Sequence, residues 1–241
     1  MDPFAAARSK DRFFLSYFEF RRSGSVSDRK IQSRANKKEK EQKKMISFKD
    51  KILMGFILRL LIFLPVSFVL WYYLAGYLLI PVGWFSSAGI EMLASGKLES
   101  LSVSGKMMVL ETNLQVQTPD GRTGFLLLEM NPLVYCWNLP LLTAMTLSAG
   151  LGRLLGLRLA AAYVGLLPFQ AWGVTFEFLK LTALQYGPEI SQQMGHGSLG
   201  REFIALGYQF GFLMLPVISA SGLWIVTHRW FIRDVLSEGG K

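Results

Sequence analysis

Residues 52–82 form one long apolar stretch in which Arg59 is the only charged side chain. A helix needs about 20 residues, each adding about 1.5 Å, to cross the hydrocarbon core of a bilayer. The stretch is also much longer than the apolar region of a signal peptide, which has about 7–15 residues. We therefore expect a first membrane-spanning helix at roughly 52–76, kinked at Pro65, with a break beyond its end favoured by Pro81 and Gly83.

Three further stretches have the same character. Residues 133–150 carry no charge, and residues 203–227 are uncharged with Gln209 as their one strongly polar side chain. Residues 159–184 are apolar except for Gln170, Glu177 and Lys180. With 51% hydrophobic residues in the chain, these stretches predict a mainly α membrane protein with four transmembrane helices, the last three within 133–228.

The segment between the first two predicted helices, 83–132, has a different pattern. In residues 107–117 apolar side chains recur at every second position from Met108 to Val116, and polar side chains lie between them. This period of two is typical of a half-buried strand. The Pro119-Asp120-Gly121 turn leads into a partner strand at 124–130, and residues 98–105 are a candidate third strand. We predict a small antiparallel β unit here.

Positive charge is concentrated at the N-terminus. Residues 1–51 hold 15 of the 26 Lys and Arg residues but 7 of the 17 Asp and Glu residues. We interpret 1–51 as a basic, disordered tail. A basic segment next to an apolar span marks a cytoplasmic end, which disfavours a nucleic-acid partner and predicts membrane lipids as the surroundings.

The charges of the loops indicate the orientation. Arg153 and Arg158 occupy a loop without acidic residues, and the tail 229–241 contains Arg229 and Arg233. The segments 83–132 and 185–202 hold most of the remaining acidic residues. Four spans then place both termini in the cytoplasm and the β unit on the outer side, which in a bacterial inner membrane is the periplasm.

The sequence offers few groups for catalysis. Cys136 is the only cysteine, and the two histidines, His196 and His228, are far apart in the chain. We therefore expect no metal site and no cofactor. A thiol nucleophile needs a base, a cation or a helix N-terminus to lower its pKa. An enzyme alternative, a membrane hydrolase or acyltransferase, would use Cys136 with Glu177 or His196.

Polar groups inside the predicted spans are the better candidates for function, because they are costly in hydrocarbon. Glu177 and Lys180 are spaced to pair at the outer interface, which would be a structural role. Gln170, Glu177 and Gln209 also allow a third hypothesis, a small oligomeric transporter. Gly207 and Gly211 form a GxxxG pattern that lets another helix approach closely.

Three motifs together resemble the exosortase H-associated membrane protein family. The first is a strand running into the helix start Asn131-Pro132-Leu-x-Tyr135, followed by Leu-Pro140-Leu. The second is Gln170-Ala-Trp172, and the third is Gly207-Tyr208-Gln209 with a following Leu-Pro. The resemblance covers about 46–228. Cys136-Trp137-Asn138 replaces a glycine-rich step that the family pattern has after Tyr135.

The resemblance implies an accessory role beside an exosortase, a multi-pass membrane transpeptidase that processes proteins bearing a C-terminal sorting signal. The chain lacks the Cys–Arg–His set of such an enzyme, so we predict a non-enzymatic partner of an exosortase or of its sorted substrates. The motif residues would then shape the helix entry and a surface facing the partner. In particular, we expect Asn131 to cap the helix that begins at Pro132, and Tyr208 and Gln209 to form hydrogen bonds between helices.

Overall fold

The computed structural model describes residues 36, 51–117, 122–150, 152–230 and 233. The chain divides into two compact units, and the larger one, Gly55–Asp234, contains the sheet and the helices discussed below, apart from residues 51–54 at the start of the first helix. In the smaller unit, Asn36 and residues 51–54 are helical. The predicted basic tail 1–51 and the tail 229–241 lie almost entirely outside the described residues.

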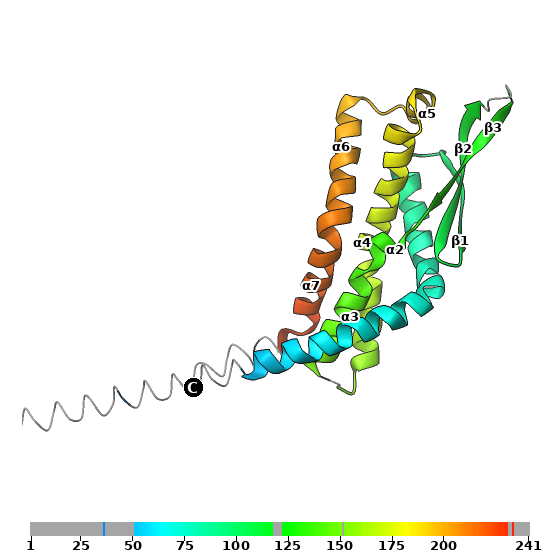
Figure 1. The fold of residues 1–241 in the computed structure, drawn as a ribbon. Helices are drawn as coiled ribbons and strands as arrows, with labels where there is room; N and C mark the ends of the chain where they lie inside the picture. Colours follow the sequence, from blue (N-terminus) through cyan, green and yellow to red (C-terminus); the bar gives the residue numbers. More distant parts are fainter. Residues whose placement is uncertain (1–35, 37–50, 118–121, 151, 231–232, 234–241) are drawn as a thin grey trace, which may run out of the picture. The chain divides into compact units, whose positions relative to one another are not determined.

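The first apolar stretch forms a helix that continues beyond its predicted end. It runs from Lys51 to Leu93 without the break expected after Pro81 and Gly83. Figure 1 shows this helix, coloured cyan to teal, changing direction along its length. A proline inside a helix removes one backbone hydrogen bond and displaces the preceding carbonyl groups. The hydroxyl of Tyr163 donates a 2.7 Å hydrogen bond to the Leu78 carbonyl, three residues before Pro81, so a neighbouring helix satisfies this carbonyl.

The predicted antiparallel β unit is confirmed, and it has three strands. These are β1 (Leu98–Ser104), β2 (Met107–Gln117) and β3 (Thr123–Met130), in the order β1-β2-β3. Every second side chain of β2 from Met108 to Leu114 is buried, as the period of two predicts. The predicted boundary at residue 83 is corrected by the structure, because 83–93 is helical and the sheet begins at Leu98.

A short helix in the connection between the last two long helices, α5 (Pro188–Met194), binds the sheet through hydrogen bonds. Strand β2 extends past the end of its pairing with β1, where Leu98 faces Thr112. The side-chain amide of Gln193, in α5, donates to the Gln115 carbonyl at 2.8 Å and accepts from the Gln115 amide at 2.9 Å. These two bonds replace those that a neighbouring strand would make.

Among the residues that the structure describes, three helices are long and apolar enough to cross a membrane, and the predicted second span is shorter. The first is Lys51–Leu93. The second, Leu155–Gln185, combines α4 (Leu155–Lys180) with the π-helix η1 (Leu181–Gln185). The third, Ser198–Thr227, combines α6 (Ser198–Gln209), the π-helix η2 (Phe210–Met214) and α7 (Leu215–Thr227).

The segment predicted as the second span divides into α2 (Leu133–Cys136) and α3 (Asn138–Ala149). Together they form one apolar helical segment, Leu133–Ala149, that is shorter than the candidate spans. At about 1.5 Å per residue, such a helix is shorter than a hydrocarbon core of about 30 Å. The described part of the chain therefore contains three candidate spans and this shorter apolar helix, whereas the sequence predicts four spans.

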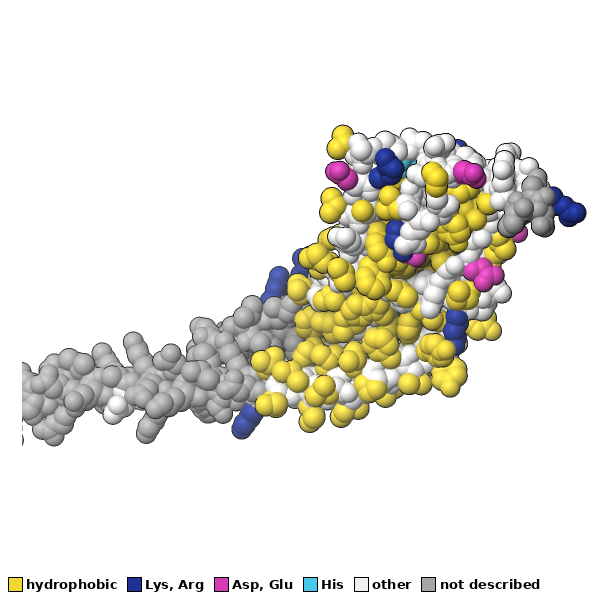
Figure 2. All heavy atoms as spheres, turned by 45° about the horizontal axis from the view of Figure 1, so that its top comes forward, with side chains coloured by type: hydrophobic (Ala, Val, Ile, Leu, Met, Phe, Trp, Pro, Cys, Tyr) yellow, Lys and Arg dark blue, Asp and Glu magenta, His cyan; other side chains and the backbone are white. Residues whose placement is uncertain are grey.

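Two groups of buried apolar side chains hold the larger unit together. One joins the inner face of the sheet to α4 and the first helix, and includes Leu110, Leu128, Ile90 and Phe178. The other joins α3, α4 and α7 around Leu142 and Leu166. Much of the outer surface is also apolar. Figure 2 shows hydrophobic side chains covering a continuous area, with the acidic side chains in the upper part of the view. Contact with the hydrocarbon core of a membrane explains why so many apolar side chains lie on the surface.

Two adjacent leucines of β3 test the orientation of the sheet. Leu128 is fully buried, whereas Leu127 is 54% exposed. We expect Leu128→Ala to lower the free energy of unfolding by about 2–5 kcal/mol, because it leaves a cavity. Leu127→Ala should change it by no more than about 0.5 kcal/mol. Denaturation of the purified protein in detergent measures both, and equal losses would contradict the assigned face.

Candidate functional site

A cluster of polar and aromatic side chains lies where α2, α4 and α6 meet. The Tyr135 hydroxyl donates a 2.7 Å hydrogen bond to Oε2 of Glu177. Lys180 Nζ lies 2.9 Å from Oε1 and 2.8 Å from Oε2 of the same carboxylate. The ammonium group also lies 4.0 Å from the centre of the Tyr208 ring. Glu177 is thus bound by two donors, and Lys180 contacts both a carboxylate and an aromatic face.

Because this cluster is mostly buried, we expect it to contribute more to stability than an ion pair on the surface does. The side chains of Glu177 and Lys180 are 17% and 14% exposed, and Tyr135 is buried. Phe212 packs its ring parallel to that of Tyr208 and edge-on to that of Tyr135. The cluster therefore connects α2, the segment just after the sheet, to α4 and to α6–η2. Its side chains are mostly shielded from solvent.

A second polar network lies deeper among the helices. Gln170 of α4 donates a 2.8 Å hydrogen bond from Nε2 to Oδ1 of Asn138, at the start of α3. Asn138 donates from Nδ2 to the Ser219 hydroxyl at 3.1 Å, and Ser219 donates to the Pro216 carbonyl of α7. All three side chains are buried. Interhelical hydrogen bonds of this kind hold membrane helices together where no water is available.

One atom of this network has no hydrogen-bond partner among the described residues. It is Oε1 of Gln170, which is buried with the rest of its side chain. A buried carbonyl without a donor costs free energy. The amide nevertheless keeps its donor side on Asn138, so Gln170 connects α4 to α3 and, through Asn138, to α7.

Glycines allow α4 to contact its neighbours at very short range. A Cβ atom on Gly207 would lie 2.0 Å from the Phe176 ring, and one on Gly211 would lie 3.0 Å from the Trp172 ring. Trp172 Nε1 donates to the Gly207 carbonyl at 3.1 Å, and its ring stacks on Phe176 with 4.6 Å between centres. The GxxxG pattern, with Gly207 in α6 and Gly211 in η2, is therefore the surface on which Trp172 and Phe176 of α4 pack.

The other predicted residues are spread along the same junction. The Asn131 side chain accepts a hydrogen bond from the Leu133 amide at 3.1 Å, so it satisfies the first turn of a helix that begins one residue later than expected. Pro132 and Pro140 are buried. Gln209 is different, because its side chain is exposed on α6. Tyr208 contacts Lys180 and Phe212 through its ring. Its hydroxyl group is a hydrogen-bonding neighbour of Tyr135 on α2.

The cysteine is not positioned at an open surface. Cys136 is 2% exposed at the end of α2 and forms no disulfide. His196 lies in the connection between α5 and α6. In the part of the chain that the structure describes, no three His, Cys, Asp or Glu side chains are placed to hold a metal ion.

Several residues that the site depends on were not predicted from the sequence. Asn138 and Ser219 complete the network of Gln170, and Gly173 admits the Tyr135 ring, since a Cβ there would lie 2.5 Å from it. Asn138 could have been found, because a strongly polar side chain within an apolar helix usually has a specific role. Ser219 and Gly173 carry no comparable signal, since small residues are common in membrane helices.

The matched region of the chain covers both polar clusters and the sheet. Residues 50–231 match the exosortase H-associated membrane protein family. The chain belongs to this family. Searches of curated proteins and of solved structures give no match. Within the exosortase H-associated region, Tyr135, Trp172 and Gly207 of the resembling motifs all contact α4 or belong to it. The geometry thus places these three motif residues on the contacts of one helix, α4.

The close contact at Gly207 can be tested with one methyl group. We expect Gly207→Ala to lower the free energy of unfolding by about 1–3 kcal/mol, because the Cβ atom would overlap the Phe176 ring. Gly222→Ala is the matched control, since a Cβ atom there meets nothing within 4 Å. Thermal unfolding in detergent measures both. The cost of Gly207→Ala should fall in a Phe176→Ala background, and an unchanged cost would contradict the proposed overlap.

The burial of Cys136 predicts a slow reaction with thiol reagents. In the folded protein, maleimide labelling of Cys136 should be several-fold slower than after unfolding in SDS, because the thiol is 2% exposed. The control is Glu129→Cys in a Cys136→Ser background, since Glu129 is exposed on β3. Fast labelling of Cys136 in the folded protein would support the enzyme alternative.

Proposed function

We propose that this protein is a non-enzymatic accessory component of the bacterial inner membrane that binds an exosortase through the exposed face of α6 and η2. Membership of the exosortase H-associated family supports the partner. The single observation that carries the choice of surface is Gln209, an exposed amide on an apolar membrane helix.

The surroundings of Gln209 explain why it needs a partner. Leu206 and Leu213, one turn before and one turn after it, are both 65% exposed. Around them the helix surface is apolar and suited to lipid tails. An amide has two donors and an acceptor, and leaving them without partners in hydrocarbon costs several kcal/mol. A polar side chain from the helix of another protein would satisfy Gln209 and make it a specific contact.

The neighbouring cluster supports the same surface. Tyr208 is adjacent to Gln209 in α6, and its ring is held between Lys180 and Phe212. The GxxxG contacts to Trp172 and Phe176 fix the same turn of the helix to α4. A side chain on a helix that is fixed in this way loses little freedom when it binds. The site is therefore organised before a partner arrives.

The proposed orientation follows the positive charges of the loops. Arg153 and Arg158 lie before or at the start of α4, and Arg229 follows α7. Both ends of the chain are then cytoplasmic, and the three-stranded sheet is periplasmic. This orientation needs α2 and α3 to return the chain through the bilayer as a fourth crossing. An extended segment on either side would have to add to the length of these short helices.

Co-purification tests the proposed function. We expect an affinity-tagged chain, extracted gently from native membranes, to retain an exosortase that mass spectrometry identifies. Gln209→Leu should reduce the recovered exosortase several-fold, because it removes the polar contact while keeping an apolar helix surface.

The matched control is Gln192→Leu, which makes the same change at an exposed position of α5. Equal recovery with Gln209→Leu and the unaltered protein would contradict the proposed surface. No exosortase with the unaltered protein would contradict the proposed partner.

A further inference from the structure

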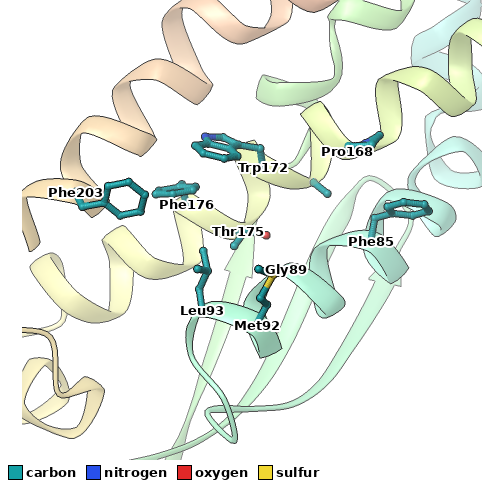
Figure 3. A pocket seen from close by; sticks show the side chains of 10 residues that line it. Phe85, Gly89, Met92, Leu93, Pro168, Trp172, Thr175, Phe176 and Phe203 are labelled. Carbon is teal, nitrogen blue, oxygen red and sulfur yellow. The ribbon is translucent and has the colours of Figure 1, made fainter. Parts of the chain in front are cut away.

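A pocket of about 310 Å³ lies between the end of the first helix, α4 and the start of α6. Its walls are almost entirely apolar. Figure 3 shows Phe203, Phe176 and Trp172 following one another along one side, and Met92 and Leu93 opposite them. Its size is near the lower end of small-molecule sites in proteins, which have about 300–1,000 Å³.

The shape of the pocket follows from the close contact of two helices. Gly89 meets α4 at Thr175, and a Cβ atom on Gly89 would lie 2.6 Å from Thr175 Oγ1. The Thr175 hydroxyl is directed to the Ser86 carbonyl at 3.5 Å, so the one polar side chain of the lining is turned toward backbone. The Trp172 ring is fixed by its hydrogen bond to Gly207. The pocket is therefore a built feature of the helix packing.

The rim of the pocket is apolar as well. Met92 is 85% exposed, and Phe85, Trp172 and Phe203 are also exposed large hydrophobic residues. Water would gain no polar partners at such an opening. All three contributing helices belong to segments long and apolar enough to cross a membrane. A molecule that enters this pocket comes from the hydrocarbon phase.

The position of the pocket along the helices indicates from which part of the bilayer a molecule would enter it. The α4 residues of the pocket, Pro168 to Phe176, precede the ionic pair of Glu177 and Lys180. On α6, Phe203 directly follows the exposed charged residues Arg201 and Glu202. The pocket thus begins just below the charged ends of both helices, at the depth where lipid acyl chains start.

We propose that the pocket binds one acyl chain of a membrane phospholipid from the leaflet on the side of the sheet. The chain inserts between the first helix and α4 and packs against Trp172 and Phe176. An α-helix with its side chains is about 10–12 Å wide and is too thick for a pocket of this volume. A flexible hydrocarbon chain can fill the pocket, and phospholipids surround the protein at high local concentration.

Photolabelling tests this proposal. The protein is placed in nanodiscs of phosphatidylcholine and phosphatidylglycerol that contain a phosphatidylcholine with a diazirine on its acyl chain. After illumination, mass spectrometry locates the adducts. We expect several-fold more adducts on Met92, Trp172 and Phe203 than on Val164, Leu206 and Leu213, which are exposed apolar residues outside the pocket.

Filling the pocket gives the matched comparison. Ala171→Phe adds a ring to the lining and should reduce the pocket adducts several-fold. Val164→Phe adds the same group two turns earlier on α4, outside the pocket, and should leave them unchanged. Uniform labelling of all exposed apolar residues in the unaltered protein would overturn the proposal. So would undiminished pocket labelling in a folded Ala171→Phe variant. The distribution in the unaltered protein remains decisive if Ala171→Phe does not fold.

Discussion

The close approach of neighbouring segments to α4 is the constraint on which the rest of the structure depends. Gly89 admits Thr175, Gly207 admits Phe176, and the Tyr135 ring lies against Gly173. Since lipid tails are as apolar as the helix surfaces, membrane helices gain little from apolar burial alone and associate through tight packing and hydrogen bonds. Because these three glycines have no side chain, their positions determine where the first helix, α2 and α6 meet α4.

These contacts bring polar groups together as a result. Once Tyr135 lies against α4, its hydroxyl reaches Glu177, and the Glu177–Lys180 pair acquires Tyr208 as a second neighbour. Gln170 reaches Asn138 in the same way. The structure thus contains polar side chains that bind one another and, at Gln209, one that is exposed to the surroundings. This difference separates groups that stabilise the protein from the group proposed to bind a partner.

Local patterns predicted the elements of this fold better than their ends or their partners. The alternation in β2 gave the buried face of the sheet, because a strand shows its two faces at successive residues. Pro81 and Gly83 predict a break beyond the end of the first helix, yet the helix continues to Leu93, and Tyr163 from another helix donates to the Leu78 carbonyl. The network of Gln170 depends on Ser219, 49 positions later in the printed sequence, and no local pattern links such distant residues.

The amide of Gln193 has a mechanical consequence. It holds the Gln115 backbone through two hydrogen bonds, so the sheet cannot slide along α5 without breaking both of them. The α5 helix lies in the short connection between η1, which follows Lys180 at the end of α4, and α6, which contains Tyr208. The sheet is therefore joined to the ends of α4–η1 and α6 by these two hydrogen bonds as well as by apolar packing, so its position along the helices is set at two places in the chain.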